Sequence, residues 1–232
     1  MHVTAIIVGA GFGRRIGGAT AKTYLPIAGR PLILRTLDRI FATPAISHVV
    51  LVVAASDVEY CRGLLNSEFS SKARACDLQA GGATRQQSVR CGLERLPATT
   101  DVVTIHDGAR PFVSPALIDR CIQAAALNGA AVVGVPVRDT IKRVSDAGYI
   151  QSTPERAGLW EIQTPQSFQR DLIVAAHDLA LREGYEATDD AMVVERMGKP
   201  VFVVEGERSN FKITVPEDLR LAEAMIRAGL VV

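Results

Sequence analysis

The sequence predicts an α/β fold, a Rossmann-like and mostly parallel twisted sheet flanked by helices, with residues 1–232 forming a single domain. Short apolar runs alternate with amphipathic helical patterns, which is typical of repeated strand–helix–strand units. The apolar runs are almost continuous in Val, Ile and Ala, as expected of strands that are covered on both faces. The chain has 232 residues, of which 48% are hydrophobic, so it is long enough to build a full core.

The elements follow one another in a regular order. Strands are predicted at Val3–Val8, His48–Ala54, Ala75–Gln79, Val102–His106 and Ala130–Val135. Helices are predicted between them at Pro31–Ala42, Asp57–Leu65, Thr84–Leu96 and Pro115–Leu127. The later pattern predicts an extended run at Leu159–Gln163, helices at Arg170–Glu183, Asp189–Met197 and Pro216–Ala228, and a strand at Pro200–Val204. Pro216 suits the first position of the last helix, and the acidic residues after it suit the first turn.

One segment, residues 138–156, interrupts this alternation. An extended stretch from Thr140 is followed by a polar turn at Ser145–Gly148 and a second extended stretch from Tyr149, which is the pattern of a β-hairpin. A hairpin that leaves an α/β body exposes its edges and usually finds a partner. We therefore expect a protruding β-arm that packs on a second copy of the chain as a homodimer. The alternative is a flap that folds back on its own domain.

Composition narrows the possible functions. The net charge is +1 without a strongly basic block, so no nucleic-acid partner is expected. No apolar run reaches the roughly 18 residues that a membrane span needs, so no membrane partner is expected either. The chain begins directly with a strand pattern, and its four cysteines, at positions 61, 76, 91 and 121, are those of a reduced core. These features predict a cytoplasmic protein.

The most informative stretch is the glycine-rich run Gly9–Arg15, which directly follows the first strand. Glycines let the backbone approach a ligand closely and expose its N–H groups, and Arg15 and Lys22 add positive charge. The dinucleotide fingerprint fails because its third glycine would fall at Arg14. The P-loop pattern fails because Ala21 stands where a glycine must precede the lysine. A different kind of phosphate loop remains, whose alternative is a glycine turn with solvated cations.

Polar residues also follow the later strands, and ligands of open α/β sheets bind at those carboxyl ends. Asp107, at one strand end, is a natural ligand for Mg²⁺, which proteins hold through one or two carboxylates together with substrate phosphates. The alternative is an aspartate that pairs with Arg110 and orders its own loop. Lys212 follows a later strand and could form a second cationic cluster. His106 is expected to pack at its strand end rather than act as a base.

Seven motifs in sequence order make the chain resemble one family closely, the 2-C-methyl-D-erythritol 4-phosphate cytidylyltransferases. The motifs are G-A-G-F-G-R-R-I from Gly9 with Lys22, G-G-x-x-R-x-x-S-V at 81–89, H-D-G-A-R-P at 106–111, P-V-R-D-T at 136–140, Q-T-P-Q at 163–166, T-D-D-A at 188–191 and N-F-K-I-T-x-P-E-D-L at 210–219. The resemblance implies transfer of CMP from CTP to methylerythritol phosphate, with release of pyrophosphate, in non-mevalonate isoprenoid biosynthesis. It also implies a divalent cation and a homodimer formed through the arm.

The resemblance also implies a role for individual residues. Catalytic charge stabilisation is implied for Arg15, Lys22 and Lys212. Nucleotide contacts are implied for Ala10, Gly11, Gly13, Gly82, Ser88 and Asp107, of which Asp107 also holds the metal. Contacts to methylerythritol phosphate are implied for Arg110, Thr140, Arg156, Thr164 and Thr188, with Arg156 reaching over from the partner's arm. Ala83 stands where some members carry an acidic residue that contacts the base or ribose. Ser209 stands where some members carry an acidic residue near the metal, which would make Asp107 the only protein carboxylate there.

Two rival functions are kept in view. A ribitol-5-phosphate cytidylyltransferase would share the nucleotide motifs and differ mainly around the acceptor. A catalytically silent nucleotide-binding protein is disfavoured because Arg15, Lys22, Asp107 and Lys212 are all present. In-line displacement at phosphorus needs positioning and charge stabilisation rather than a general base, which agrees with the lack of a convincing His or Ser dyad.

Overall fold

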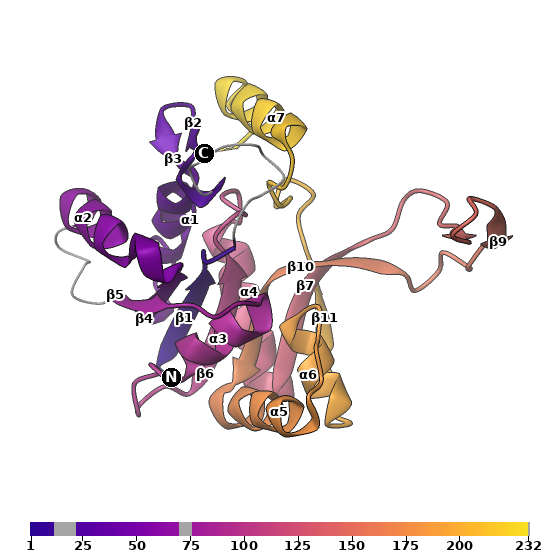
Figure 1. Cartoon of the computed structure of the whole chain (residues 1–232), viewed down its shortest axis with the longest axis horizontal. Coiled ribbons are helices and arrows are strands. Elements are labelled where there is room, and N and C mark those ends of the chain that lie inside the picture. The colour runs from indigo at the N-terminus through magenta and orange to yellow at the C-terminus, as the bar shows by residue number, and fades with distance from the viewer. Residues whose placement is uncertain (12–21, 70–75, 232) are drawn as a thin grey trace.

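The computed structural model describes residues 1–11, 22–69 and 76–231, and for Lys22 it describes the backbone alone. Two pairs of the described strands, β2-β3 and β8-β9, are separate, and the other seven form one sheet in the order β11-β7-β10-β6-β1-β4-β5 (Figure 1). Their bounds are β1 (Val3–Val8), β4 (Ile46–Val53), β5 (Cys76–Ala80), β6 (Val102–Asp107), β7 (Ala130–Pro136), β10 (Trp160–Gln169) and β11 (Phe202–Glu205). Every neighbouring pair is parallel except those that involve β10, so the predicted α/β class is confirmed.

Helices pack on both faces of this sheet. The helices are α1 (Leu32–Phe41), α2 (Val58–Glu68), α3 (Arg85–Leu93), α4 (Pro115–Asn128), α5 (Arg170–Glu183), α6 (Asp190–Arg196) and α7 (Pro216–Arg227). The first, second and fourth contribute to one core cluster, whereas α3, α5 and α6 contribute to the cluster on the opposite face. Helix α7 caps a smaller third cluster with Ile27 and Phe112. The short elements are η2 (Lys22–Tyr24), β2 (Pro26–Ile27), β3 (Arg30–Pro31), η3 (Ala55–Asp57), β8 (Arg143–Val144) and β9 (Ile150–Ser152).

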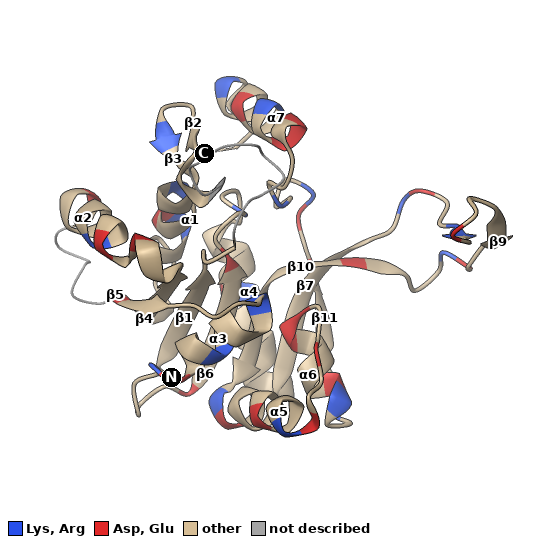
Figure 2. Ribbon diagram, viewed as in Figure 1, with Lys and Arg blue, Asp and Glu red and all other residues tan. Residues whose placement is uncertain are grey.

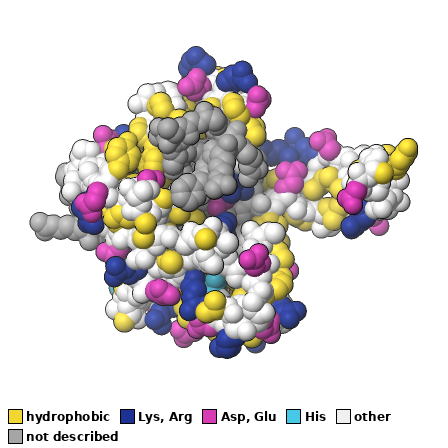
Figure 3. All heavy atoms as spheres, viewed as in Figure 1, with side chains coloured by type: hydrophobic (Ala, Val, Ile, Leu, Met, Phe, Trp, Pro, Cys, Tyr) yellow, Lys and Arg dark blue, Asp and Glu magenta, His cyan; other side chains and the backbone are white. Residues whose placement is uncertain are grey.

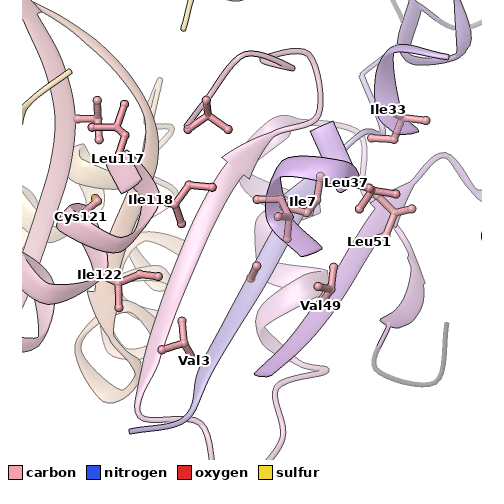
Figure 4. Packing of buried hydrophobic residues seen from close by; sticks show 14 of the residues in the cluster. Val3, Ile7, Ile33, Leu37, Val49, Leu51, Leu117, Ile118, Cys121 and Ile122 are labelled. Carbon is pink, nitrogen blue, oxygen red and sulfur yellow. The ribbon is translucent and has the colours of Figure 1, made fainter. Parts of the chain in front are cut away.

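The first strand shows why apolar residues run without interruption through the sheet. Ile7 of β1 packs in the cluster that contains Leu37 of α1 and Leu51 of β4 (Figure 4). The preceding residue of the strand, Ile6, packs in the opposite cluster with Val89 of α3. Successive side chains of a strand point to opposite faces, so a strand between two helical layers must be apolar at every position.

Strand β10 is longer than the predicted extended run, and the sequence pattern made no prediction of its direction. The sequence pattern predicts an extended run only at 159–163, whereas β10 continues to Gln169 and lies between β6 and β7. It runs antiparallel to both, with Phe168 opposite Val103 on one side and Ala130 on the other. Its later residues include Gln, Ser and Pro, which do not form the apolar pattern by which a buried strand is recognised, although this part of the strand is buried.

The predicted hairpin is confirmed, and its alternative as a flap is not observed. Strands β8 and β9 pair antiparallel around the predicted turn, where Gly148 takes a φ of +83° that favours glycine. The hairpin extends away from the body of the molecule (Figure 1). Its apolar side chains are exposed, including Val144 at 51%, Tyr149 at 76% and Ile150 at 63%.

Of the four predicted core cysteines, Cys61 and Cys121 are buried, whereas Cys76 and Cys91 are half-buried, and all four are free thiols. Within residues 1–11, 22–69 and 76–231, no helix has both the length and the apolar character that crossing a bilayer requires.

A glycine in α3 sets how closely this helix approaches the sheet. A Cβ at Gly92 would lie 2.7 Å from a methyl of Ile6 and 3.1 Å from one of Val52, so Gly92→Ala is expected to destabilise the fold by about 1–3 kcal/mol. The control is Gly63→Ala in α2, where a Cβ would meet nothing within 4 Å and should add up to about 1 kcal/mol of helix stability. Urea unfolding should therefore move the two midpoints in opposite directions. Equal midpoints would contradict the packing.

Candidate active site

A cavity of about 270 Å³ opens at the carboxyl ends of the parallel strands. Its walls come from the ends of β1, β5 and β6, the start of α3 and the segment after β11. The described residues that line it are Val8, Ala10, Gly11, Thr23, Gly82, Ala83, Thr84, Arg85, Ser88, Asp107, Ala109, Lys212 and Thr214. This is the edge at which the sequence predicts a ligand site.

Asp107, the last residue of β6, is the electrostatic centre of the cavity. Its Oδ1 accepts a hydrogen bond from Nε of Arg85 at 3.2 Å, and its Oδ2 lies 2.9 Å from Nζ of Lys212. Nε of Arg110 lies 3.6 Å from the same Oδ2. The Asp107 side chain is only 9% exposed, so these attractions act in a medium that screens them weakly.

The charge state of Asp107 follows from this environment. Burial alone would raise the pKa of its carboxyl, but the positive charges of Arg85, Lys212 and Arg110 outweigh burial and lower it far below the ordinary value. Asp107 is therefore ionised at any pH at which the protein works. The carboxylate therefore brings three cations together: Arg85 from α3, Arg110 from the loop after β6, and Lys212 from the segment after β11.

A relay of hydrogen bonds fixes the end of β6 beneath the cavity. The backbone N–H of Asp107 donates to Oγ1 of Thr164 at 3.0 Å, and this hydroxyl lies 3.0 Å from Nδ1 of His106. The other ring nitrogen, Nε2, lies 3.0 Å from the carbonyl oxygen of Arg110, which can only accept. Nε2 therefore carries the proton, and Nδ1 accepts the proton of Thr164.

His106 is thus a packed and neutral residue, as the sequence predicts. Its side chain is completely buried, and burial lowers its pKa to about 4. Both ring nitrogens are occupied within the fold, so neither is available to a substrate.

The start of α3 forms the wall on the β5 side. Thr84 caps the helix by accepting from the backbone N–H of Gln87 at 3.1 Å, and Gln87 closes the capping box. Oγ of Ser88 donates to the carbonyl of Thr84 at 2.9 Å and lies 3.2 Å from the N–H of Gly82. A Cβ at Gly82 would lie 2.5 Å from Cβ of Gln87, so the tight turn at the start of α3 requires glycine here.

Comparison with known proteins identifies the family and supports the fold. The family model of 2-C-methyl-D-erythritol 4-phosphate cytidylyltransferase matches residues 3–228. The chain belongs to this family. The 2-C-methyl-D-erythritol 4-phosphate cytidylyltransferase of Syntrophotalea carbinolica is 45% identical over 227 residues, which cover 97% of this chain and 97% of that protein.

Solved structures of the cytidylyltransferase family agree with the architecture. The crystal structure of 4-diphosphocytidyl-2C-methyl-D-erythritol synthase from Anaerococcus prevotii superimposes with a TM-score of 0.86 at 32% identity, covering 97% of this chain and 96% of that one. The 2-C-methyl-D-erythritol 4-phosphate cytidylyltransferase of Thermus thermophilus gives a TM-score of 0.77 at 36% identity, covering 96% of this chain and 98% of that one.

Within this family architecture, most of the predicted nucleotide residues meet in one cavity. The predicted residues that line it are Ala10, Gly11, Gly82, Ser88, Asp107 and Lys212. Gly13, Arg15 and the side chain of Lys22 lie outside the described residues, so their predicted roles stay predictions. Gly11 has nothing within 4 Å of the position a Cβ would take, so its backbone faces open space in the described part of the chain.

The residues predicted for the acceptor are less concentrated. Arg110 and Lys212 line a neighbouring cavity of about 210 Å³ beside the base of the arm. Thr164 is buried beneath Asp107, whereas Thr188 is exposed and its hydroxyl contacts the sulfur of Met192 at 3.0 Å. The residues on the arm, Thr140 and Arg156, are exposed, and Arg156 donates from Nη1 to the carbonyl of Arg138.

Two members of the site were not predicted as site residues. Arg85 belongs to the G-G-x-x-R motif, yet its pairing with Asp107 becomes visible only when α3 is placed beside β6. Asn210 is completely buried and donates from Nδ2 to Oε1 of Gln163 at 3.0 Å and to the carbonyl of Thr164 at 2.8 Å. Asn210 stands in the N-F-K-I-T motif, but nothing local to the motif shows that its side chain is buried.

The donor set fits a hard divalent cation that arrives with a polyphosphate. Asp107 is the only acidic residue among the described residues that line the cavity, and no group of three His, Cys, Asp or Glu side chains occurs in residues 1–11, 22–69 and 76–231. Mg²⁺ commonly uses one or two carboxylates and takes its remaining ligands from substrate phosphates and water. Because Asp107 is a single carboxylate, the site meets that requirement only when the phosphates of a nucleotide are present.

Proposed function

We infer that this chain transfers CMP from CTP to 2-C-methyl-D-erythritol 4-phosphate, giving 4-diphosphocytidyl-2-C-methyl-D-erythritol and pyrophosphate in non-mevalonate isoprenoid biosynthesis. The observation that carries this conclusion is the match of residues 3–228 to the cytidylyltransferase family. The cavity agrees with it, because glycine backbone and cationic side chains meet at the carboxyl ends of the strands.

The chemistry follows from the groups that are present. An oxygen of the acceptor phosphate attacks the α-phosphorus of CTP, the bond from that phosphorus to the β-phosphate oxygen breaks, and pyrophosphate leaves with its electron pair. The attacking oxygen is already ionised, so no base is needed. Positioning and stabilisation of the negative charge in the transition state account for the rate.

We assign the charge stabilisation to Lys212 together with Arg15 and Lys22. Lys212 lines the cavity, and Nζ lies 2.9 Å from the buried carboxylate of Asp107, which holds the ammonium in a defined orientation. Arg15 and Lys22 join it on the family pattern of the glycine-rich loop. The base and ribose of CTP are assigned to the backbone of Ala10, Gly11, Gly13 and Gly82 together with Ser88.

Asp107 is proposed as the protein ligand of a divalent cation, on which members of this family typically depend. A bound Mg²⁺ would be held by Asp107 together with phosphate oxygens and would neutralise charge on the triphosphate. In this proposal Arg85 and Arg110 keep Asp107 ionised and oriented before the nucleotide binds.

The acceptor site is proposed to lie between two copies of the chain. Arg110, Thr164 and Thr188 would come from one copy, and Arg156 from the arm of the other. The arm carries exposed apolar side chains along with both signs of charge, which suits burial against a partner (Figures 2 and 3). Residues 1–232 would then act as a single nucleotidyltransferase domain within a homodimer, with 138–156 as the dimerisation arm.

The acceptor is tested by measuring pyrophosphate release from CTP with each of two polyol phosphates. We expect turnover with 2-C-methyl-D-erythritol 4-phosphate and at most trace turnover with ribitol 5-phosphate. Release with ribitol 5-phosphate alone would overturn the assignment. No release with either would favour a nucleotide-binding protein without catalysis.

Removing either cation of the glycine-rich loop should abolish turnover without unfolding the protein. Arg15→Met and Lys22→Ala are each expected to lower kcat by about a hundredfold or more, because each takes a positive charge from the transition state. Lys199→Ala is the matched control, since Lys199 is exposed after α6 and is not among the residues that line the cavity. Turnover that stays within threefold of wild type would remove the two residues from catalysis.

Charging the tip of the arm should separate the proposed dimer. Tyr149→Asp combined with Ile150→Asp places two carboxylates on side chains that are 76% and 63% exposed, so the isolated fold should tolerate them. Light scattering after size exclusion should report a monomer that has lost acceptor turnover. Leu127→Asp is the control, because Leu127 is 85% exposed at the end of α4 and away from the arm. A dimer that survives the double substitution would contradict the proposed interface.

A further inference from the structure

A line of buried charges connects the cavity to the helical layer behind it. Lys212 contacts Asp107, Asp107 contacts Arg85, and Arg85 in turn contacts Asp190 at the start of α6, with 2.8 Å between Nη1 and Oδ2. Oδ1 of Asp190 lies 3.2 Å from Nε2 of His177 in α5. The side chains of Asp190 and His177 are only 1% and 2% exposed.

Arg85 is the link in this line that depends most on its neighbours. Its guanidinium is held by Asp107 through Nε and by Asp190 through Nη1, while Nη2 is buried and has no hydrogen-bond partner among the described residues. Burial lowers the pKa of Arg85, but the two carboxylates outweigh burial and raise it above the ordinary value. Two carboxylates on different elements, Asp107 at the end of β6 and Asp190 in α6, therefore hold this side chain.

Asp190 is the fixed end of the Arg85–Asp190 pair. Its backbone N–H donates to Oε1 of Gln166 at 3.0 Å, and the next N–H, that of Ala191, donates to the same oxygen at 3.2 Å. Nε2 of Gln166 donates to Asp189, which caps the helix. The start of α6 is thus fastened to β10, which fixes the backbone position of Asp190.

We propose that Asp190 is a positioning residue for CTP binding, which acts through Arg85 on Asp107 and Lys212. By holding Nη1, Asp190 limits Arg85 to a single hydrogen bond with Asp107. Without it, Arg85 is free to turn both nitrogens toward Asp107, the fork geometry that arginine prefers with carboxylates. Such a pair would compete for the oxygen that now faces Lys212. This inference rests on the proposed function.

The net charge around Arg85 means that the direction of the change in CTP affinity distinguishes the possible roles of Asp190. Arg85, Arg110 and Lys212 meet Asp107 and Asp190, an excess of one positive charge when His177 is neutral. Removing the charge of Asp190 raises this excess, so a purely electrostatic role predicts tighter binding of the polyanionic nucleotide. A positioning role predicts weaker binding. A role in folding alone predicts a lower Tm and unchanged affinity.

The test is isothermal titration calorimetry with CTP and Mg²⁺ on the full chain, with a Tm recorded for each variant. Asp190→Asn is expected to weaken CTP binding about tenfold, the order typical of groups that orient a metal-site ligand. In an Arg85→Ala background the same substitution should weaken it no further, because Asp190 acts through Arg85. Asp190→Glu keeps the negative charge and should bind CTP more tightly than Asp190→Asn. If the asparagine variant does not fold, Asp190→Glu is compared with Arg85→Ala instead and should again bind CTP more tightly.

Ser167→Ala is the matched control for stability. It removes a buried hydroxyl that lies 2.8 Å from Oγ1 of Thr104, so it should lower Tm and leave CTP affinity within twofold. Unchanged or tighter CTP binding by folded Asp190→Asn would overturn the inference, as would equal losses with and without Arg85. A wild-type chain that binds CTP yet releases no pyrophosphate would refute the proposed function instead, while the calorimetric comparison would still decide the role of Asp190.

Discussion

Lys212→Ala is expected to lower kcat/KM for CMP transfer by about a hundredfold or more, the loss typical when one preorganised charge is taken from a phosphoryl-transfer site. Lys212 is 37% exposed and reaches the cavity, while its contact with Asp107 holds Nζ at a defined point. The loss should fall on kcat more than on the KM for CTP, because negative charge increases in the transition state. Steady-state kinetics at saturating Mg²⁺ measure both.

The fold should tolerate Lys212→Ala, which keeps the kinetic result interpretable. Asp107 retains Arg85 and Arg110 as partners, so its carboxylate stays paired. Lys199→Ala, at an exposed position after α6, is the control for loss of a lysine charge and should act like wild type. A Lys212→Ala enzyme within threefold of wild-type kcat would refute the catalytic assignment.

Asp107→Asn is expected to cost both stability and activity, unlike Lys212→Ala. It removes the one anion that Arg85, Arg110 and Lys212 share, and Arg110 is only 11% exposed. Leaving buried cations without their carboxylate typically costs about 3–5 kcal/mol, and the partial exposure of Lys212 and Arg85 places the expected loss near the lower end. Urea unfolding without nucleotide should show it.

The activity loss of Asp107→Asn should reach about a hundredfold and should depend on Mg²⁺ concentration, because the amide is a poor ligand for a hard cation. Asp77→Asn is the matched control: Asp77 is 56% exposed and pairs with His48 at 3.2 Å, so its loss should change stability by less than about 1 kcal/mol. If the two variants lost the same stability, Asp107 would not be the centre of the charge cluster. If added Mg²⁺ changed neither the rate of the Asp107→Asn enzyme nor that of the Asp77→Asn enzyme, Asp107 would not be the metal ligand.

The positions of most strands along the chain, and the edge of the sheet that carries the cavity, could be predicted from the sequence. The apolar runs predicted strands within a few residues, because burial on both faces leaves an unbroken pattern in Val and Ile. Asp107, Gly82 and Ser88 could be assigned to one edge because parallel strands share their carboxyl ends. Lys212 and Asp107 were named separately, and their contact of 2.9 Å joins them.

Strand β10 and the charged contacts behind the cavity could not be predicted from the sequence. Residues 164–169 carry Gln, Ser and Pro, so local pattern does not reveal a buried strand that runs antiparallel between β6 and β7. The hydroxyl of Thr164 accepts from the N–H of Asp107, a contact that nothing in the neighbouring residues reveals. Asp190 belongs to the T-D-D-A motif at 188–191, in which only Thr188 was predicted as a site residue.

The α/β class, the glycine-rich run, the family and the hairpin could be predicted from the sequence alone, because each is written in contiguous residues or in motifs whose order is visible without coordinates. The contacts by which Arg85 bridges Asp107 and Asp190, and by which Gln166 fastens α6 to β10, became visible only in three dimensions. Those contacts join residues 22 to 105 positions apart. They depend on where a strand inserts into the sheet, which is settled by packing and not by local propensity.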